Sequence, residues 1–292
     1  MSTGAPADIV RVSAHLWSVR LPCDTLPPYD HVNAYVVAGG GVAVVVDPGS
    51  NRPEAQAMLR AALTAAGARL LKGIALTHTH PDHVDGVPPL AAYEADRNGT
   101  APPLLVHAAE AGNLPDRNVT YLADGRVLTV GDATMTALHT PGHSPGHLTF
   151  VVAGPAGEVE AALVGDLAVA TGSVWVGLPE GDVSAYLATL ERVAAIGAPL
   201  LAPGHGALIE NPVRRLQELA AHRREREAQV LAALAVGSAT AAEITRRVYP
   251  GHPDAVLALA EQTVLAHLVK LMREMKVVHL GDDHRGPYAL RG

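Results

Sequence analysis

Short apolar runs alternate with breaks that contain glycine and proline over residues 1–210. The runs at residues 16–21, 31–37 and 42–46 have the length and valine content of buried strands, and they predict a sheet. The segment 53–66 instead repeats alanine, leucine and methionine at helical spacing, with a proline in its first turn, and predicts a helix. Further strands and helices continue in this mixed order, so the pattern indicates an α+β domain.

Side chains that can bind metal ions follow several of these apolar runs directly. The run 70–76 is followed by Thr-His-Thr-His-Pro-Asp-His at residues 77–83, and three later runs each lead to one more such side chain. The candidate ligands are His78, His80, Asp82, His83, His143, Asp166 and His205. Loops at the ends of rigid strands can bring side chains from distant segments to one point. We therefore expect these side chains to converge.

Five imidazoles and two carboxylates are too many ligands for one tetrahedral ion and suit a pair of ions. These donors favour zinc, with iron or manganese as alternatives. Two neighbouring dications need a shared anion, which a carboxylate or a hydroxide can supply. Bound metal lowers the pKa of water from 15.7 to about 7, so such a hydroxide exists at neutral pH. The other interpretation, a set of solvated loop histidines, leaves their ordered placement after apolar runs unexplained.

The order His-x-His-x-Asp-His, followed by His143, Asp166 and His205, resembles the metallo-β-lactamase superfamily. The resemblance implies an αββα sandwich of two mixed sheets and a dinuclear metal-dependent hydrolase whose nucleophile is a metal-bridging hydroxide. It assigns one ion to His78, His80 and His143, and the other ion to Asp82, His83 and His205. Asp166 would bridge the two ions, which makes Asp82 and Asp166 the candidate catalytic carboxylates.

Three further residues are candidates for supporting roles. Asp47 ends the run 42–46, and the resemblance implies that it packs beneath the metal centre and hydrogen-bonds a metal-binding loop. An ordinary Asp-Pro-Gly turn is the alternative for Asp47. His147 resembles a supporting residue of the same motif. Trp175 lies in a glycine-rich loop and would either contact substrate or cover part of the core.

The composition changes near residue 211. Residues 1–210 carry 20 acidic and 10 basic side chains, whereas residues 211–292 carry 9 acidic and 12 basic ones. Helical patterns at 212–234, 241–248 and 255–275 precede two short strands, 277–280 and 287–290, around a polar turn at 281–286. This order predicts a winged helix. We therefore expect a catalytic domain at 1–210 and a winged-helix domain at 211–292.

The C-terminal part resembles the β-lactamase-like protein 2 group at residues 222–227, 243–249 and 267–271. This resemblance implies cleavage of single-stranded RNA, with the arginines at positions 223, 224 and 226 on the polar face of a long helix contacting phosphates. It also allows hydrolysis of a small ester, lactone or acyl thioester, which the acidic catalytic domain and the three lysines of the chain favour. A nucleic-acid-binding regulator with a vestigial enzyme domain is a further alternative. Thr79 and Pro81 depart from the group's motif, which weakens the inference that this protein acts on the same substrate as the group.

Composition and the N-terminal sequence indicate the cellular compartment of the protein. No run of eighteen apolar residues is present, so we expect no membrane partner. The first ten residues lack the pattern of a signal peptide, and the single Cys23 fits a reducing compartment. Both features indicate the cytoplasm. The C-terminal domain would serve as a lid over the substrate or as the surface of a homodimer.

Overall fold

The computed structural model describes residues 8–114, 118–281 and 286–292. The chain packs as two compact units, which are described separately. The first consists of Met1–Thr140, Gly146–Gly172 and Ile196–Pro212, and the second of Pro141–Pro145, Ser173–Ala195 and Val213–Gly292. The predicted boundary between residues 210 and 211 stays a prediction.

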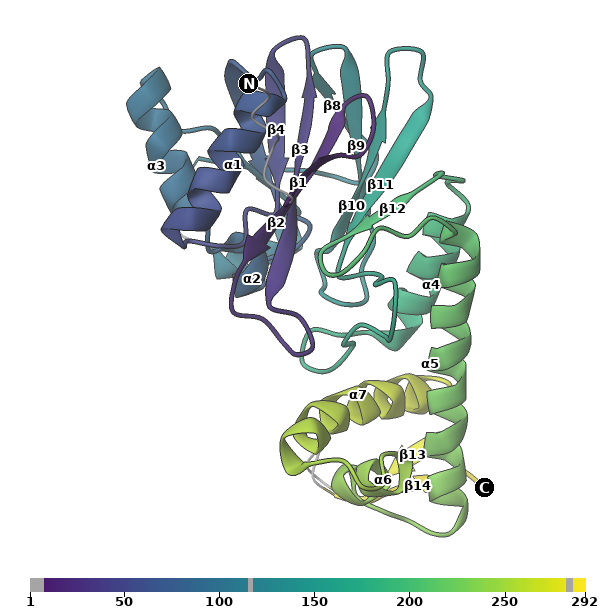
Figure 1. The fold of residues 1–292 in the computed structure, drawn as a ribbon. Helices are drawn as coiled ribbons and strands as arrows, with labels where there is room; N and C mark the ends of the chain where they lie inside the picture. The colour runs from purple at the N-terminus through teal and green to yellow at the C-terminus, as the bar shows by residue number, and fades with distance from the viewer. Residues whose placement is uncertain (1–7, 115–117, 282–285) are drawn as a thin grey trace. The chain divides into compact units, whose positions relative to one another are not determined.

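Two sheets form the first unit (Figure 1). The seven-stranded sheet follows the chain order from β1 to β7, and the five-stranded sheet has the order β12-β11-β10-β9-β8. The strands of the first sheet are β1 (Ile9–Arg11), β2 (Leu16–Pro22), β3 (His31–Gly39), β4 (Val42–Val46), β5 (Leu70–Ala75), β6 (Leu104–Val106) and β7 (Val119–Tyr121). Those of the second are β8 (Arg126–Val130), β9 (Ala133–His139), β10 (Leu148–Ala153), β11 (Val159–Gly165) and β12 (Leu201–Pro203).

Strand β3 is buried on both faces, and its alternation divides the core. Val32, Ala34 and Val36 pack with the helices α1 (Pro53–Ala65) and α3 (Val87–Asn98), which cover the outer face of the seven-stranded sheet (Figure 1). Tyr35 and Val37 point the other way, into an apolar layer between the two sheets. This period of two is what a strand imposes, and it explains why almost all of β3 is apolar.

The register of two strand pairs brings the candidate ligands together. β4 and β5 are parallel, with Val46 opposite Ala75, so the residues that follow them emerge at one edge of the sheet. β11 and β12 are also parallel, with Gly165 opposite Pro203. The segments that begin at Asp47 and Thr77 therefore leave the sheet next to each other. The same holds for Asp166 and the loop that leads to His205. Ligands usually bind at the carboxyl ends of parallel strands.

The second unit contains the helices α4 (Val183–Ala194), α5 (Pro212–Ala235), α6 (Ala241–Val248) and α7 (Asp254–Arg273) and the strand pair β13 (Val277–His279) and β14 (Tyr288–Leu290). The predicted capping box is present, because the Thr240 and Glu243 side chains each bond the other residue's backbone N–H. The strands of the predicted wing pair in antiparallel fashion. The wing turn at 281–286 lies mostly outside the described residues.

Helix α7 is long and apolar enough to resemble a membrane span, and it is the one such helix among the described residues. Its inner face is buried in the core of the winged helix, where Val264, Leu268 and Leu271 pack with Ile244 of α6. Core helices of globular domains have this composition, so α7 adds no evidence for a membrane partner.

Four short elements lie outside the pattern of apolar runs. β1 and β7 are strands of three residues at the two ends of the larger sheet. The helix α2 (Pro81–Val84) is about one turn long, and the 3-10 helix η1 (Ala108–Asn113) is about two turns long. The sequence pattern predicts a loop throughout 77–83, but proline at the first helical position starts α2 inside it.

The expectation that the arginines of α5 occupy a polar face is wrong for Arg223. Its side chain is buried at 3% exposure, donates a hydrogen bond to the backbone oxygen of Val174 and lies over the Tyr186 ring. The Arg226 guanidinium lies over the ring of Tyr249 and donates to Gln229. Arginine can be buried when its charge faces an aromatic ring and an acceptor, and a hydrophobicity pattern does not distinguish this case.

Replacing Arg223 by methionine should therefore destabilise the protein, by about 2 kcal/mol, because the Val174 carbonyl loses its donor and the ring contact is lost. Arg224→Met is the matched control. Arg224 is exposed and paired with Glu191, so its loss should change stability by less than about 0.5 kcal/mol. Urea unfolding of both variants measures the difference. Equal stabilities would contradict a structural role for Arg223.

Candidate metal centre

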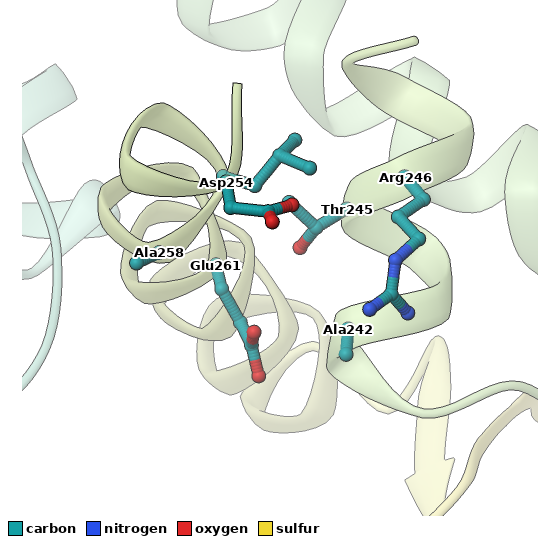
Figure 2. Close-up of a pocket in the computed structure, with 7 residues that line it drawn as sticks. Ala242, Thr245, Arg246, Asp254, Ala258 and Glu261 are labelled. Carbon is teal, nitrogen blue, oxygen red and sulfur yellow. The ribbon is translucent and has the colours of Figure 1, made fainter. Parts of the chain in front are cut away.

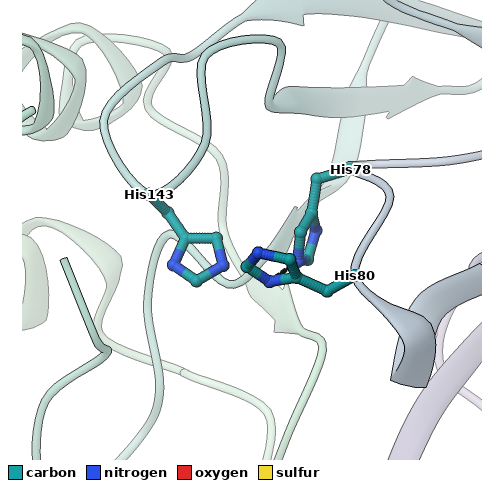
Figure 3. Close-up of side chains that lie close together, drawn as sticks. All are labelled: His78, His80 and His143. Carbon is teal, nitrogen blue, oxygen red and sulfur yellow. Dashed lines mark hydrogen bonds between the residues drawn. The ribbon is translucent and has the colours of Figure 1, made fainter. Parts of the chain in front are cut away.

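The structure brings all seven predicted ligands into three overlapping groups. Within each group, one nitrogen or oxygen atom from every residue lies within 4.8 Å of the others. The groups are Asp82, His83 and His205; His78, His83 and Asp166; and His78, His80 and His143, the last shown in Figure 3. His83 and His78 each belong to two groups, so the groups form one continuous set of donors.

The spacing within the first two groups fits a shared ion better than direct hydrogen bonds. His205 Nε2 lies 3.4 Å from Asp82 Oδ2 and 3.5 Å from Asp166 Oδ1. His83 Nε2 lies 3.4 Å from the same Asp166 oxygen. Hydrogen bonds of this type are about 2.9 Å long, whereas donors bound about 2.0–2.1 Å from one tetrahedral zinc ion lie about 3.3–3.4 Å apart.

One buried nitrogen atom lacks a partner that a metal ion would supply. His83 is fully buried, and its Nε2 has no hydrogen-bond partner. A buried ring nitrogen without a partner is costly in an apolar surrounding, unless an ion or water satisfies it. A divalent ion between His83, Asp166 and their neighbours would do so. The residues present therefore fit the metal centre that the sequence predicted.

Asp47 fixes the orientation of His83. One oxygen of its carboxylate accepts a hydrogen bond from Thr77 N at 2.7 Å. The other accepts from Thr77 Oγ1 at 2.7 Å and from His83 Nδ1 at 2.9 Å. Asp47 adopts a left-handed backbone conformation (φ 51°), which is uncommon for a residue other than glycine and which aims its carboxylate beneath the loop. Asp47 thus bonds the metal-binding loop, and its supporting role toward a bound metal stays a prediction.

Backbone oxygens orient two other imidazoles in the same way. His205 Nδ1 donates to the carbonyl of His31, and His143 Nδ1 donates to the carbonyl of Trp175, each at 2.7 Å. A carbonyl can only accept, so the proton of each ring lies on Nδ1 and the lone pair on Nε2. The ring of Tyr29 stacks on His205 at 5.3 Å. Both imidazoles thus present Nε2 as a ligand atom.

The titration of the site follows from its crowded charges. Burial lowers the pKa of His83, but the Asp47 and Asp166 carboxylates raise it by more, so the pKa lies well above its ordinary value. The pKa of His205 is also raised, because Asp82 and Asp166 outweigh its burial. Burial raises the pKa of Asp82, yet His205, His83 and Thr25 together bring it down to about 2. A metal ion competes with protons for imidazole nitrogens, so the raised pKa values of His83 and His205 make metal affinity depend on pH.

Two glycines allow the segments of the site to approach closely. A Cβ atom on Gly49 would lie 1.7 Å from the backbone oxygen of Asp82, and one on Gly204 would lie 2.6 Å from His83 Cε1. Neither distance can be accommodated by a small shift. The Asp-Pro-Gly turn after β4 and the loop after β12 therefore need glycine at these positions.

The remaining predicted site residues lie near the ligands but are not part of the three groups. His147 is fully buried, and its Nδ1 lies 2.9 Å from the hydroxyl of Thr140. Its ring centre is 5.5 Å from that of His78. Trp175 acts on His143 through its backbone oxygen, while its indole N–H donates to the backbone of Leu259 at 3.3 Å. A substrate contact for Trp175 stays a prediction.

Two residues that contact the ligands or their loop carry no signal in the sequence. Thr25 Oγ1 donates to Asp82 Oδ2 at 2.5 Å and so fixes one oxygen of that carboxylate. Glu110 accepts hydrogen bonds from Thr79. Both residues are remote from the histidine motif along the chain, and no local pattern marks a side chain that reaches a loop from another segment.

A pocket of the second unit lies between α6 and α7 and contains none of these residues. Its lining combines Arg246 with the carboxylates of Asp254 and Glu261 (Figure 2). Ala242, Thr245, Leu257 and Ala258 complete the lining. The two carboxylates outnumber the one guanidinium, so the charge of this lining does not favour a phosphate ligand.

Comparison with known proteins identifies the class. Residues 27–205 match the metallo-beta-lactamase superfamily, and residues 240–286 match the beta-lactamase associated winged helix domain. The chain belongs to the metallo-beta-lactamase superfamily and is a metal-dependent hydrolase of that superfamily. The predicted fold, a metallo-β-lactamase sandwich with a C-terminal winged helix, is confirmed.

Individual relatives extend over most of the chain. An atrochrysone carboxyl ACP thioesterase of Aspergillus fumigatus is 31% identical over 229 residues, which are 74% of this chain and 68% of the relative. The lactamase-like protein vrtG of Penicillium aethiopicum is 33% identical over 255 residues, 84% of this chain and 77% of the relative. The metallo-beta-lactamase family protein TTHA1429 of Thermus thermophilus has a TM-score of 0.76 at 26% identity, covering 96% of this chain and 100% of that one.

The donor set predicts two divalent ions per chain. Protein purified without chelators and supplied with zinc should retain about two equivalents after desalting, because each ion would have three ligands of its own and Asp166 would be shared between them. Asp166→Ala should retain one equivalent or less, since the carboxylate that faces both His83 and His205 is lost. Elemental analysis by mass spectrometry measures both. Two tightly held equivalents in the variant would contradict a bridging role for Asp166.

Asp47→Asn tests the support of His83. The amide cannot accept all of the hydrogen bonds that the two carboxylate oxygens accept, so the His83 ring loses its fixed orientation. The affinity of the weaker zinc site should fall about 10–100-fold, with the fold retained. Asp85→Asn is the control, because Asp85 lies in the same region and is exposed. Competition with a chromophoric chelator measures the affinities, and equal values for both variants would remove Asp47 from the metal centre.

Proposed function

We propose that this protein hydrolyses the acyl thioester of a small molecule, and that related small esters or lactones are secondary substrates. The single observation that carries the choice of substrate is the pairing of the arginines on α5. The Arg223 guanidinium is buried, and that of Arg224 is paired with Glu191. Glu218 pairs with both Arg214 and Arg215. Binding of a nucleic-acid strand depends on cations that are available to its phosphates. Arg223 is not available, and at Arg214, Arg215 and Arg224 a phosphate would have to replace a carboxylate that is already paired.

The relatives support the same substrate class. The Aspergillus fumigatus relative is named for an acyl carrier protein thioester, and a second relative with the same type of name, from Passalora fulva, is 32% identical over 228 residues. Cleavage of RNA and the regulator with a vestigial enzyme domain stay predictions that rest on the resemblance of the C-terminal part. Localisation in the cytoplasm and a homodimer likewise stay predictions.

The ligand set assigns roles to the residues of the chain. One ion would be held by Asp82, His83 and His205, the other by His78, His80 and His143, with Asp166 between them. When bound, the ions would lower the pKa of a coordinated water toward about 7 and polarise the acyl carbonyl. Thr25 keeps the Asp82 carboxylate in one orientation, and Asp47 does the same for the His83 ring.

The chemistry of the leaving group also favours a thioester. A thiol has a pKa of about 8.5, so a thiolate departs near neutral pH without a dedicated proton donor. An alcohol leaving group is far more basic, and its departure needs a proton from a general acid. His83, His143 and His205 each have a hydrogen-bonded Nδ1 that directs Nε2 toward the site, so these rings would serve as metal ligands. A thioester therefore makes the smaller demand on this set of side chains.

Zinc is the ion that we propose first, and iron is the alternative. Imidazole and carboxylate ligands suit both metals. A solved relative, TTHA1623, has been described in a di-iron-bound form, and it is 29% identical over 66% of this chain with a TM-score of 0.51. Activity of protein loaded separately with zinc, iron or manganese would decide among them.

The test compares a thioester and an RNA in one series. Zinc-loaded protein should release thiol from benzoyl-N-acetylcysteamine, detected with a thiol reagent, and Asp166→Ala should lower that rate more than about 100-fold. A labelled single-stranded RNA should remain intact under the same conditions. The exposed Arg224→Gln variant should act as wild type on the thioester. RNA cleavage that Arg224→Gln weakens, without release of thiol, would overturn the proposal and favour the phosphodiester.

A further inference from the structure

Glu110 is a buried carboxylate in the 3-10 helix η1, with an exposed fraction of 3%. Three donors converge on it. Oε2 accepts from Thr79 Oγ1 at 2.6 Å and from Thr79 N at 3.3 Å, and Oε1 accepts from Gly146 N at 2.8 Å. Burying a carboxylate costs free energy of desolvation, which hydrogen bonds from several donors offset. Such a carboxylate holds the segments that carry its donors in fixed positions.

The partners of Glu110 belong to the two segments that carry the imidazoles of the third donor group. Thr79 lies between His78 and His80, and Gly146 follows His143 by three residues. His78 Nε2 and His80 Nδ1 lie 3.0 Å apart. Because Thr79 is bonded through both its backbone and its hydroxyl, the carboxylate restrains the peptide that separates these two rings.

The local structure is shaped around this carboxylate. A Cβ atom on Gly146 would lie 2.6 Å from Glu110 Cγ and 3.0 Å from Oε1, so a larger residue would displace the side chain. On the other side, His107 caps η1 by accepting from Ala109 N at 3.2 Å, and Glu110 N donates to the His107 backbone oxygen at 3.0 Å. The backbone of Glu110 is thereby fixed by a capped helical turn.

We propose that Glu110 and Thr79 form a positioning pair for the metal ion at His78 and His80. Glu110 holds the Thr79 peptide so that the neighbouring imidazoles keep one separation and one orientation before the ion binds. It makes no contact with substrate. The inference rests on the proposed metal centre and is independent of the choice between thioester and RNA.

The chemistry predicts which substitutions the pair tolerates. Both oxygens of Glu110 accept hydrogen bonds from backbone N–H groups. Glutamine has only one oxygen, and its NH2 group would face an N–H of either Thr79 or Gly146 in either orientation. Thr79→Val keeps the shape and removes the hydroxyl donor, whereas Thr79→Ser keeps the donor. The pair therefore requires a carboxylate at 110 and a hydroxyl at 79.

The experiment titrates zinc alone against a chromophoric chelator, at a temperature where every variant is folded. Glu110→Gln and Thr79→Val should each weaken one of the two zinc sites about 10–100-fold, which is the usual effect of removing a partner of a metal ligand. Thr79→Ser should restore most of the affinity. The visible spectrum of the cobalt-loaded protein should change in the first two variants and stay as wild type in Thr79→Ser.

Leu59→Ala separates positioning from stability. Leu59 lies in α1 and is fully buried in the core, so its truncation lowers the melting temperature without touching the donors. Its zinc affinity and cobalt spectrum should match wild type. If Glu110→Gln fails to fold, Thr79→Val and Thr79→Ser decide the question. Wild-type affinity and spectrum in Thr79→Val, or an equal loss of affinity in Leu59→Ala, would overturn the proposal.

Discussion

The crowding of imidazoles and carboxylates in a buried place is the constraint on which this structure depends. Ring nitrogens and carboxylate oxygens face one another at 3.0–3.5 Å around His83, Asp166 and His205 and between His78 and His80. Lone pairs at such distances repel unless a proton or a metal ion lies between them, and burial increases the cost. The strong rise in the pKa of His83 expresses the same demand for positive charge. Two dications would satisfy it for the whole set.

The fold meets this demand with rigid strands and close approaches of the backbone. Two parallel strand pairs end at the site. In each pair one strand leads to a carboxylate, Asp47 or Asp166, and the other leads to imidazoles, three after β5 and His205 after β12. Asp47 and two backbone carbonyls then fix which ring nitrogen points inward. Glycines at 49, 146 and 204 remove the side chains that would keep these loops apart. Orientation of the ligands before binding lowers the cost of ordering them when the metal arrives.

Most of the strands and all of the candidate ligands could be predicted from the sequence, because both depend on local patterns. The apolar runs set the strands, the histidine motif after residue 76 holds four of the candidate ligands in one short segment, and each of the other three follows an apolar run. Glu110 and Thr25 could not be predicted, because each reaches the site from a segment with no distinctive spacing. The burial of Arg223 could not be predicted for a related reason. A helical pattern treats arginine as polar, although here a ring and a carbonyl compensate its charge.

A dinuclear centre requires two ions at the positions that the side chains define. Anomalous diffraction at the zinc edge, from crystals of the zinc-loaded protein, tests this most directly. We expect two peaks per chain, one within about 2.0–2.2 Å of His83 Nε2, His205 Nε2 and an oxygen of Asp82, the other equally close to His78 and His80. Asp166 should lie between the two peaks. A single peak, or peaks bound by other residues, would contradict the dinuclear centre.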